Sequence, residues 1–451
     1  MQPSVVIFRD QILPYSETFI PAQVNHFRRY QGFYVGTTTL SDDCFPLPDD
    51  RKIVLDQCTK RHKLWKNLYM RLGIVHPRWL SQIKSLAPRL IHAHLGIDGV
   101  LAMPLAKQLK IPLVVTFHGY YATAEVDLAY GIPAQLTGLT ALIHRDRFYP
   151  TLFYRQRSRL FRTADQIIAV SQFIRDRLIK RGCPPEKIQV HYIGVDLKQL
   201  TPDLRVVRQP TVLFVGRLIE KKGCEYLIRA MAEVQIERPD CELVLIGEGT
   251  QRSALEALAA NSLKSYRFLG VQSPEKVRSW MNQAAVLAAP SVTGKQGNSE
   301  GLPMVILEAQ AMGLPVVSSW HAGIPEAVEH EKSGFLTLER DTQAIAAYLL
   351  TLLENEELRK TMAIQGRKKV ECQFDVCKNT KTLEALYDHL NHKKGWQLSS
   401  PFLAFLKAQR ILPKALTRMV GTAHHNLALV ELSAIVDQAI AIVEQRRISV
   451  M

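Results

Sequence analysis

Short apolar runs alternate with helical patterns along almost the whole length of the 451-residue chain. The runs are continuous in Val, Ile and Leu, which is typical of strands buried on both faces of a parallel sheet. Strands and helices in this order form a doubly wound α/β sheet. In the first half we expect strands at 5–8, 33–37, 90–94, 113–117, 166–170 and 189–193, with helices such as 99–110 and 172–181 between them.

The alternation is interrupted once. The segment from Leu200 to Asp203 and on to Gln209-Pro210 is rich in Pro, Asp and charge, which indicates a linker between domains. Beyond it the pattern restarts, with strands expected at 212–215, 243–246, 266–269, 286–289 and 316–318 and helices at 224–234, 253–260, 274–283 and 302–312. We therefore predict an α/β fold of two Rossmann-like domains, 1–198 and 199–373, that face each other across a cleft, where open α/β sheets bind ligands.

Helical patterns continue from Gln343 to about His392, and a tail follows the break at Gly395–Ser400. We expect this tail, residues 395–451, to be helical. It begins basic and ends in an apolar helix over Asn426–Gln445 that has few charges.

The composition limits the class of protein. Hydrophobic residues make up 47% of the chain and charged residues 22%, which excludes a disordered, collagen-like or coiled-coil protein. The seven cysteines are scattered, and no CxxC or Cys/His cluster has zinc spacing, so we expect reduced thiols. No signal-peptide pattern and no uncharged apolar run of roughly 18 residues is found. These observations predict a cytoplasmic location.

The net charge of +15 is concentrated in the first 200 residues, which carry 27 Lys and Arg against 15 Asp and Glu. A basic domain favours an anionic partner: a membrane surface, a phosphorylated acceptor or a nucleic acid. No nucleic-acid motif is present, so we expect no nucleic-acid partner. The basic stretch Lys60–Arg78, with Trp65, Tyr69 and the following Trp79, is a candidate membrane contact, and an amphipathic helix packed on the sheet is its alternative. In the tail the candidate contact, or packing on domain one, falls to Phe402, Leu403, Phe405 and Leu406 beside Lys407 and Arg410.

One segment carries most of the chemical information: Asn298-Ser299-Glu300-Gly301-Leu302-Pro303, followed by an apolar helix that contains Glu308. Proline is favoured in the first turn of a helix, so backbone N–H groups near Gly301 should be free at a helix N-terminus, where a diphosphate can bind. Glu300 would lie just before the helix and Glu308 about 9 Å along it, so both carboxylates could accept hydrogen bonds from sugar hydroxyls. The alternative is two exposed glutamates, but a carboxylate among the apolar neighbours of Glu308 is costly unless it is paired.

A second segment, from Gly216-Arg217 to Lys222-Gly223, stands at the end of the first strand of domain two. Gly216 lets a ligand approach the backbone, while Arg217 offers a forked donor and Lys222 a point charge for phosphate oxygens. Basic residues in such loops are common, so this segment gains its weight from the Glu300 segment in the same domain.

Two further candidates lie in domain one. His118 and Gly119 follow the strand 113–117, so we expect His118 to face the cleft, although a lone histidine can also be structural. Glu17 and Thr18 follow the first strand within Tyr15-Ser16-Glu17-Thr18-Phe19. They form either a polar loop opposite the donor site or a box that caps a helix.

Together these residues resemble the glycosyl-group-1 family of retaining GT-B glycosyltransferases, in particular bacterial enzymes of exopolysaccharide and lipopolysaccharide assembly. Glu300 and Glu308 are similar to the E-x7-E signature of that family. The similarity extends from about residue 4 to about residue 390. Its other pieces are the Gly216–Gly223 loop, Phe117–Gly119, Asp165–Ser171, Val190–Asp196, Pro14–Phe19 and Ala322–Glu326.

The resemblance implies a role for each candidate residue. Arg217 and Lys222 would bind the donor diphosphate, and Glu300 with the backbone of Gly301, Leu302 and Pro303 would contact the donor sugar and phosphates. Glu308 would hold the ribose hydroxyls, and Val271 with Gly270 would contact the base. His118 would contact the transferred sugar near its reacting carbon, and Glu17 with Thr18 would face the donor phosphate or the acceptor. The family often has Asp three residues after the histidine, where this chain has Tyr121. The last helix, near 374–390, would cross back onto domain one.

The reaction implied by the resemblance moves a sugar from a nucleoside-diphosphate sugar, with a UDP-sugar as the preferred donor, to a glycan or lipid-linked acceptor. Retention without an enzymic nucleophile implies front-face attack. No apolar strand ends in D-x-D, so we expect no metal and no other cofactor, with Arg217, Lys222 and the helix N-terminus stabilising the leaving diphosphate. We expect the basic domain to dock on the inner face of the cytoplasmic membrane.

Other functions remain as alternatives. A nicotinamide dehydrogenase is disfavoured because Gly247–Arg252 lacks the third glycine of a G-x-G-x-x-G fingerprint. A GT-B epimerase or phosphorylase, and a non-catalytic sugar-nucleotide-binding protein, are the other two. Intact Glu300/Glu308 and Arg217/Lys222 pairs argue against a protein that only binds.

Overall fold

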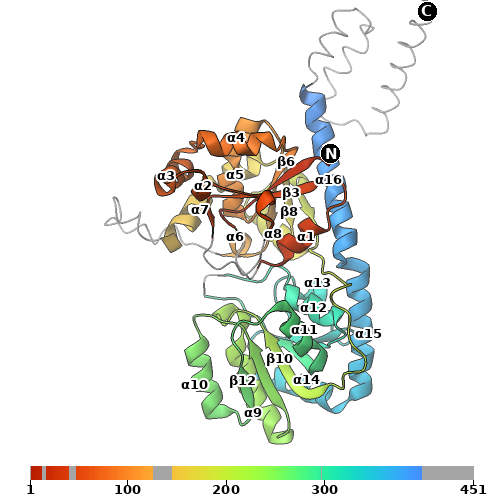
Figure 1. Cartoon of the computed structure of the whole chain (residues 1–451). Helices are drawn as coiled ribbons and strands as arrows, with labels where there is room; N and C mark the ends of the chain where they lie inside the picture. Colours follow the sequence, from red (N-terminus) through yellow and green to blue (C-terminus); the bar gives the residue numbers. More distant parts are fainter. Residues whose placement is uncertain (1, 13–16, 40–46, 125–144, 296, 399–451) are drawn as a thin grey trace, which may run out of the picture. The chain divides into compact units, whose positions relative to one another are not determined.

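The computed structural model of the chain describes residues 2–12, 17–39, 47–124, 145–295 and 297–398 (Figure 1). The chain divides into two compact units, Met1–Asn391 and His392–Met451. The expected tail from residue 399 onward, including Phe402, Leu406 and the helix Asn426–Gln445, lies outside the described residues, as does Ser16. Among the described helices, none is both long and apolar enough to cross a membrane.

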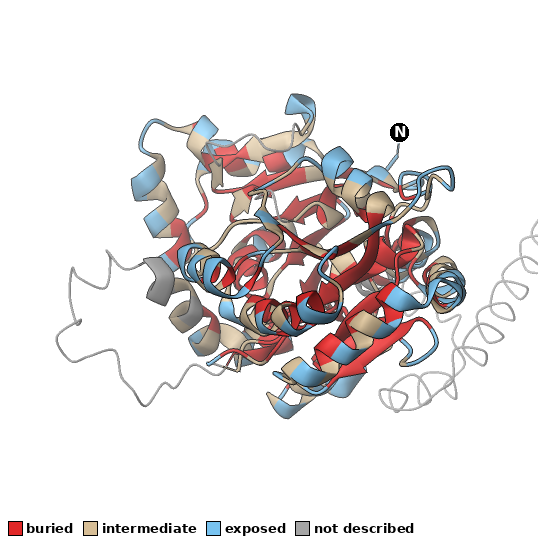
Figure 2. Ribbon diagram, turned by 90° about the horizontal axis from the view of Figure 1, so that it is seen from below, coloured by how far each residue is buried: buried red, intermediate tan, exposed pale blue. Residues whose placement is uncertain are grey.

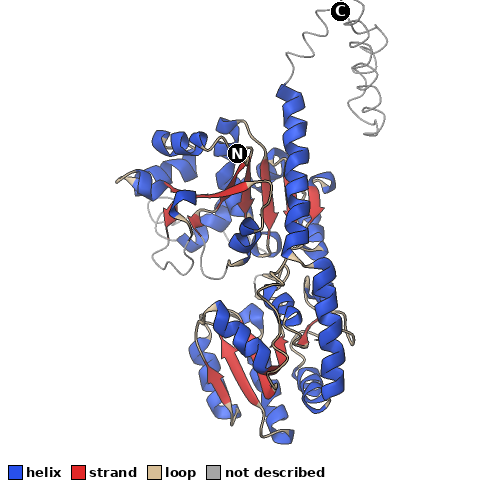
Figure 3. Cartoon of the chain, turned by 45° about the vertical axis from the view of Figure 1, so that its right-hand side comes forward, coloured by secondary structure: helices blue, strands red, loops and turns tan. Residues whose placement is uncertain are grey.

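The first sheet has seven parallel strands in the order β5-β3-β1-β6-β7-β8-β9. Helices follow the strands on the chain, and this alternation is visible in Figure 3. The strands are β1 (Ser4–Phe8), β3 (Gln31–Gly36), β5 (Lys52–Val54), β6 (Leu90–His94), β7 (Leu113–Phe117), β8 (Gln166–Ala169) and β9 (Ile188–Val190). The helices are α1 (Phe19–Asn25), α2 (Leu55–Cys58), α3 (His62–Leu72), α4 (Pro77–Ser85), α5 (Gly96–Leu109), α6 (Tyr120–Thr123), α7 (Arg145–Thr163) and α8 (Gln172–Lys180).

Both faces of this sheet are buried, as continuous apolar strands require. Val6 and Phe8 of β1 belong to one apolar cluster, and the alternate residues Val5 and Ile7 belong to another. The strands accordingly appear as buried in Figure 2, while the helices that cover them present an exposed outer side.

The second sheet has six parallel strands in the order β12-β11-β10-β13-β14-β15. Its strands alternate in the same way, since Phe214 and Leu213 of neighbouring positions fall in different clusters. The strands are β10 (Gln209–Val215), β11 (Glu242–Ile246), β12 (Tyr266–Phe268), β13 (Ala284–Ala289), β14 (Val316–Ser319) and β15 (Gly334–Thr337). The helices are α9 (Cys224–Glu237), α10 (Arg252–Ser262), α11 (Pro274–Gln283), α12 (Met304–Ala311), α13 (Ile324–Ala327), α14 (Thr342–Glu354) and α15 (Glu356–Gln373).

The last described helix, α16 (Val376–Leu398), packs on the first sheet. Leu383, Tyr387 and Leu390 share an apolar cluster with Val5 and Ile7 of β1. The chain reaches this position through a bridge between Val195 and Asp375, in which Val195 N donates to Phe374 O and Val376 N donates to Val195 O.

Three details correct the expectations. Strands β5 and β15 did not stand out in the sequence, because each has only three or four residues at a sheet edge. The linker is shorter than predicted, because Gln209 and Pro210 already belong to β10. Tyr69 and Trp79 are 2% and 0% exposed, because they pack edge to face in the core. They are therefore not part of a membrane contact, and the amphipathic-helix alternative holds for them.

Candidate active site

The central residue of the site is Glu300, which lies in the loop between β13 and α12 and is 6% exposed. Its Oε1 atom lies 3.0 Å from Nζ of Lys222, off the line of a hydrogen bond, and 3.5 Å from Nζ of Lys221. Burial raises the pKa of Glu300, but the charges of the two lysines outweigh burial and lower the pKa to about 2. The site thus holds a fully ionised carboxylate between two ammonium groups.

The two lysines come from one short turn. Residues Glu220–Lys222 form a single 3-10 turn after β10, and Gly223 ends it with φ of 67°. A Cβ atom on Gly223 would lie 1.9 Å from the carbonyl oxygen of Pro290, so the turn is pressed directly against the chain that leaves β13. This close approach brings both lysines to Glu300. Sequence reasoning selected Lys222 and missed Lys221.

Lys221 is as central as Lys222. Its side chain is 11% exposed, and its Nζ also lies 3.5 Å from the carbonyl oxygen of Ser299. Burial lowers the pKa of Lys221, while Glu300 opposes that shift. A buried cation next to other cations and only one carboxylate can accept a further anion.

Helix α12 begins one position later than predicted. Pro303 is the N-cap, with φ −69° and ψ 111°, rather than a residue of the first turn, and Met304 is the first helical residue. Proline lacks an N–H in either position, so the backbone donors available at this end remain those that follow it and those of the Glu300 loop.

Glu308 lies in the second turn of α12 and is partly exposed. Burial raises the pKa of its carboxyl to about 7, and Arg278 opposes that shift. Within the described part of the chain no side chain donates a hydrogen bond to it. Glu300 and Glu308 therefore have opposite electrostatic surroundings, although one motif contains both.

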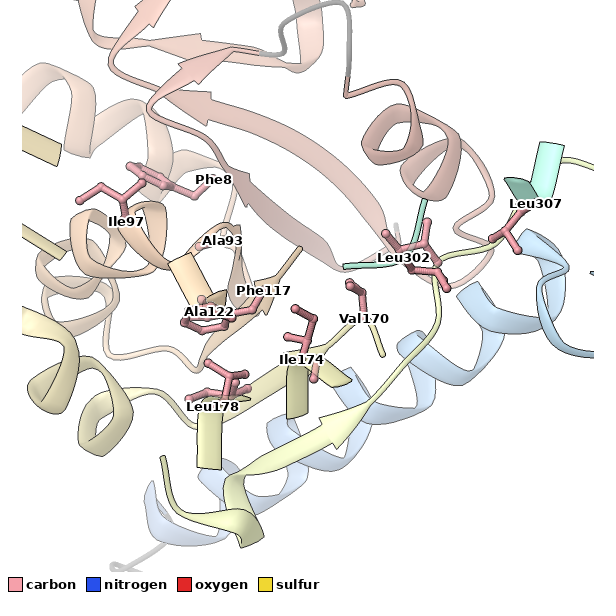
Figure 4. Packing of buried hydrophobic residues seen from close by; sticks show 14 of the residues in the cluster. Phe8, Ala93, Ile97, Phe117, Ala122, Val170, Ile174, Leu178, Leu302 and Leu307 are labelled. Atoms are coloured by element: carbon pink, nitrogen blue, oxygen red, sulfur yellow. The ribbon is translucent and has the colours of Figure 1, made fainter. Parts of the chain in front are cut away.

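His118 and the Glu300 loop meet through their backbones. A Cβ atom on Gly301 would lie 2.0 Å from the carbonyl oxygen of His118, and Ser299 N donates to Oγ1 of Thr123 at 3.1 Å. The side chain of Leu302 is 6% exposed and belongs to the same apolar cluster as Val170 and Ile174 (Figure 4). Leu302 can therefore offer a ligand its backbone but not its side chain.

The ring of His118 lies in a group of buried histidines. Its Nε2 is 3.2 Å from Nδ1 of His94, and its ring centroid is 4.8 Å from that of Phe19. Burial, with a contribution from Arg9, lowers the pKa of His118 to about 3, so the ring is neutral near pH 7. His92, His94, His118 and His191 line a cavity of ≈ 10 Å³, which has room for one water molecule.

Glu17 is held by Arg9. Nε and Nη2 of Arg9 donate to Oε2 and Oε1 of Glu17 at 2.8 and 2.6 Å, and Nη1 pairs with Asp98. Burial raises the pKa of Glu17, while Arg9 and then Arg217 oppose the shift. Arg217 itself is exposed and thus open to a ligand. Thr18 is the N-cap of α1, but its hydroxyl makes no capping hydrogen bond, so the capping-box alternative does not hold.

The remaining candidates lie at the carboxyl ends of β10, β11 and β12. Gly216 N donates to Ile246 O, and Gly247 N donates to Gly270 O, so these ends are tied to one another. Val271 follows Gly270 and is 49% exposed, which leaves it accessible to a ligand. Tyr121 packs against Phe153 at 5.0 Å between ring centroids, and burial raises its pKa, so it supplies no negative charge.

Two polar residues near Glu300 were not found from the sequence. His321 follows β14 and accepts a hydrogen bond from Glu300 N, and Glu339 follows β15 and pairs with His321. Their position directly after apolar strands was the available signal. Across the residues that the structure describes, no group of three or more His, Cys, Asp or Glu side chains has the geometry to hold a metal ion. Metal independence remains a prediction.

Two family profiles match the chain and together cover most of it. Residues 201–369 match the family described as "Glycosyl transferases group 1", and residues 26–199 match "Glycosyltransferase Family 4".

Individual relatives agree with these matches. The amylovoran biosynthesis glycosyltransferase AmsK of Erwinia amylovora is 33% identical over 65% of this chain and 68% of its own length. The protein named WcaL of Escherichia coli (strain K12), for colanic acid biosynthesis, is 35% identical over 63% of this chain and 66% of its own length. The chain thus spans about two thirds of these relatives.

Solved structures match over a longer range at lower identity. HepE of Anabaena, in complex with UDP and glucose, has a TM-score of 0.63 at 19% identity and covers 86% of this chain and 100% of its own. Sucrose-phosphate synthase of Thermosynechococcus elongatus has a TM-score of 0.66 at 21% identity, over 86% of this chain and 99% of its own. At this identity the similarity speaks for the fold, and the predicted architecture of two Rossmann-like domains is confirmed.

Proposed function

Because the chain belongs to the group 1 glycosyltransferases and has the GT-B fold of these enzymes, we propose that it transfers a sugar from a nucleoside-diphosphate sugar to a glycan or lipid-linked acceptor. The proposed transfer retains the anomeric configuration, needs no metal ion and serves the synthesis of a cell-surface polysaccharide. The observation that carries the proposal is the pair Lys221 and Lys222 around the ionised Glu300. The roles of AmsK and WcaL in polysaccharide synthesis support the choice of pathway, and the UDP bound to HepE supports UDP as the donor nucleotide.

The proposed donor site follows from charge. Departure of a nucleoside diphosphate leaves negative charge on the leaving oxygen, which fixed cations stabilise without reorganisation. Lys221, Lys222 and Arg217 supply three positive charges, of which Glu300 compensates one. The bound diphosphate would compensate the other two.

The carboxylates have different tasks in this proposal. Glu300 is ionised and close to the phosphate site, so it accepts hydrogen bonds from the donor sugar. Glu308 accepts hydrogen bonds from the ribose hydroxyls, in the same helix and further from the lysines. Val271 and Gly270 contact the base.

The proposed acceptor side lies in domain one. Both oxygens of Glu17 face Arg9, and a buried carboxylate repels a phosphate, so we assign Glu17 and Thr18 to the acceptor rather than to the donor phosphate. His118 is neutral, so it adds no positive charge beside a sugar carbon that becomes positive in the transition state. In the front-face reaction the acceptor oxygen forms its bond to the anomeric carbon as the bond to the diphosphate breaks. The departing phosphate oxygen takes the acceptor proton.

We also propose that domain one docks on an anionic membrane surface, where a lipid-linked acceptor would lie. Residues 57–97 contain eight Lys and Arg and no Asp or Glu. On α3 and its flanks the exposed positions include Lys60, Lys63, Leu64, Leu72 and Ile74. Basic residues beside exposed apolar ones suit an interface with anionic lipid, at about 1 kcal/mol per basic residue near the surface.

The first experiment is a thermal-shift screen with UDP, GDP and their sugars, because a ligand that binds the folded state raises its stability. We expect UDP to stabilise the protein. Transfer to an added acceptor, with the anomeric configuration of the product read by NMR, then separates a transferase from an epimerase, a phosphorylase or a protein that only binds. Stabilisation without transfer or donor hydrolysis would favour the binding protein.

The second experiment is sedimentation with vesicles. Binding should require anionic lipid and decrease between low and about 0.5 M salt, because salt screens surface charges. The variant Lys60→Glu/Lys63→Glu should lose binding. Its control is Lys264→Glu/Lys276→Glu, which reverses two exposed charges on domain two. Equal binding to neutral and anionic vesicles would contradict the docking proposal and leave the transferase proposal intact.

A further inference from the structure

The loop that carries Glu300 is tied at both ends to one pair of side chains. Nε2 of His321 lies 3.2 Å from the backbone nitrogen of Glu300, and Nδ1 of His321 lies 2.7 Å from Oε1 of Glu339. Oε2 of Glu339 accepts from Thr293 N at 2.8 Å, and its Oε1 accepts from Oγ1 of Thr293 at 3.0 Å. Thr293 and Glu300 bracket the loop, so His321 and Glu339 connect its beginning to its end.

The hydrogen bonds fix the protonation of His321. A backbone N–H can only donate, so Nε2 of His321 must be the accepting, unprotonated nitrogen. The ring proton therefore lies on Nδ1 and is donated to Glu339. A carboxylate that orients an imidazole in this way holds the ring in one tautomer and in one plane.

The position of the pair gives it access to the chemistry. His321 is 3% exposed and follows β14, and Glu339 follows β15, so both stand on rigid strand ends. Glu300 carries the carboxylate that meets Lys221 and Lys222, and its backbone leads into Gly301 and the N-terminus of α12. Whatever fixes Glu300 N therefore fixes these donors too.

We propose that His321 and Glu339 are positioning residues, which hold the Glu300 loop in the shape that receives the donor diphosphate. This inference deepens the proposed function and rests on it for the identity of the ligand. Neither side chain needs to touch the donor. Their effect is exerted through the backbone of Thr293 and Glu300.

The test uses substitutions that remove or preserve the hydrogen bonds. His321→Ala removes both. His321→Gln keeps an acceptor oxygen for Glu300 N and a donor nitrogen for Glu339, so it should restore most of the wild-type behaviour. Glu339→Gln can satisfy His321 or Thr293 N but not both, and it is the second variant if His321→Ala fails to fold. The matched control is His330→Gln, because Nδ1 of His330 also accepts from a backbone amide, Leu336 N, in the same domain.

Two binding probes separate positioning from general loosening. In His321→Ala the affinity for UDP should fall about tenfold, the factor that one lost hydrogen bond typically gives, with a matching rise in KM for the donor. The affinity for uridine, which lacks the diphosphate, should not change, nor should KM for the acceptor. His321→Gln should recover the UDP affinity. Unchanged UDP affinity in His321→Ala and Glu339→Gln, or an equal loss of UDP and uridine affinity, would overturn the proposal.

A readout without ligand keeps this inference separate from the proposed function. Amide hydrogen exchange over residues 293–303 should be faster in His321→Ala than in wild type or His330→Gln. If wild type binds no nucleoside diphosphate, the proposed function fails and exchange alone decides on the clamp. Exchange that is unchanged over 293–303, or increased equally throughout domain two, would overturn it.

Discussion

The variant Glu300→Gln tests the electrostatic core of the site most directly. In the folded protein the pKa of Glu300 is lowered from 4.5 to about 2. Since one pKa unit corresponds to about 1.4 kcal/mol, the ionised form gains on the order of 3 kcal/mol from its surroundings. The amide of Gln keeps the shape but not the charge, and it leaves Lys221 and Lys222 beside each other. We expect the free energy of unfolding of this domain to fall by about 3 kcal/mol at pH 7.

The pH dependence gives the sign of the effect. A carboxyl with a lowered pKa in the folded state stabilises it above the ordinary value, and this stabilisation is lost as pH falls from about 4.5 towards 2. The difference between wild type and Glu300→Gln, measured by urea denaturation at several pH values, should therefore be largest above pH 5 and shrink below it. Glu308→Gln is the control. Because burial raises the pKa of Glu308, neutralising it should not destabilise the domain.

Ligand binding should respond in the opposite direction. Without the Glu300 carboxylate, a diphosphate is the only counter-ion for the two lysines, so UDP should stabilise Glu300→Gln more than it stabilises wild type. Turnover should nevertheless fall, because Glu300 also accepts hydrogen bonds from the donor sugar. A variant that is as stable as wild type from pH 4 to 8, or one that no longer binds UDP, would refute this reasoning.

Three further outcomes are expected. Arg217→Ala and Lys222→Ala should each lower kcat for transfer by a factor of about 100, because each removes a charge that faces the leaving diphosphate; normal turnover in the double variant would contradict the assignment. The pKa of Glu308 is raised to about 7, so kcat/KM for the donor should rise through pH 7 as the accepting carboxylate forms, and this limb should be absent in Glu308→Gln. Activity measured in EDTA should be unchanged, and a loss that Mn²⁺ restores would reveal a metal site outside the expectations.

The order of the strands was predictable because burial on both faces leaves a continuous apolar run. Strands β6, β7 and β11 carry such runs and begin and end within a residue of their expected positions. The edge strands β5 and β15 pair with one neighbour only, so their sequences need fewer apolar residues and give a weaker signal. The start of β10 was missed for a related reason, since its first two residues, Gln209 and Pro210, are polar or turn-forming and still lie in the sheet.

The site was predictable as far as parallel strands bring their carboxyl ends to one edge. That rule selected Gly216, His118 and Glu300, which follow β10, β7 and β13. It could not separate Lys221 from Lys222, because both reach Glu300 only through the packing of one turn against Pro290. It also missed His321 and Glu339, because a hydrogen bond between two loops depends on side-chain geometry that adjacent residues do not record.

Gly301 shows why a correct residue can carry more than one cause. The sequence suggested glycine there because a diphosphate would need free backbone N–H groups. In the structure a Cβ atom at this position would also lie 2.0 Å from His118 O and 3.0 Å from a methyl group of Val170. Gly301→Ala would therefore displace the contact between the Glu300 loop and domain one, whether or not an anion binds. Loss of activity in that variant would not test the anion site, whereas changes at Lys221, Lys222 and His321 leave this backbone contact in place and do test it.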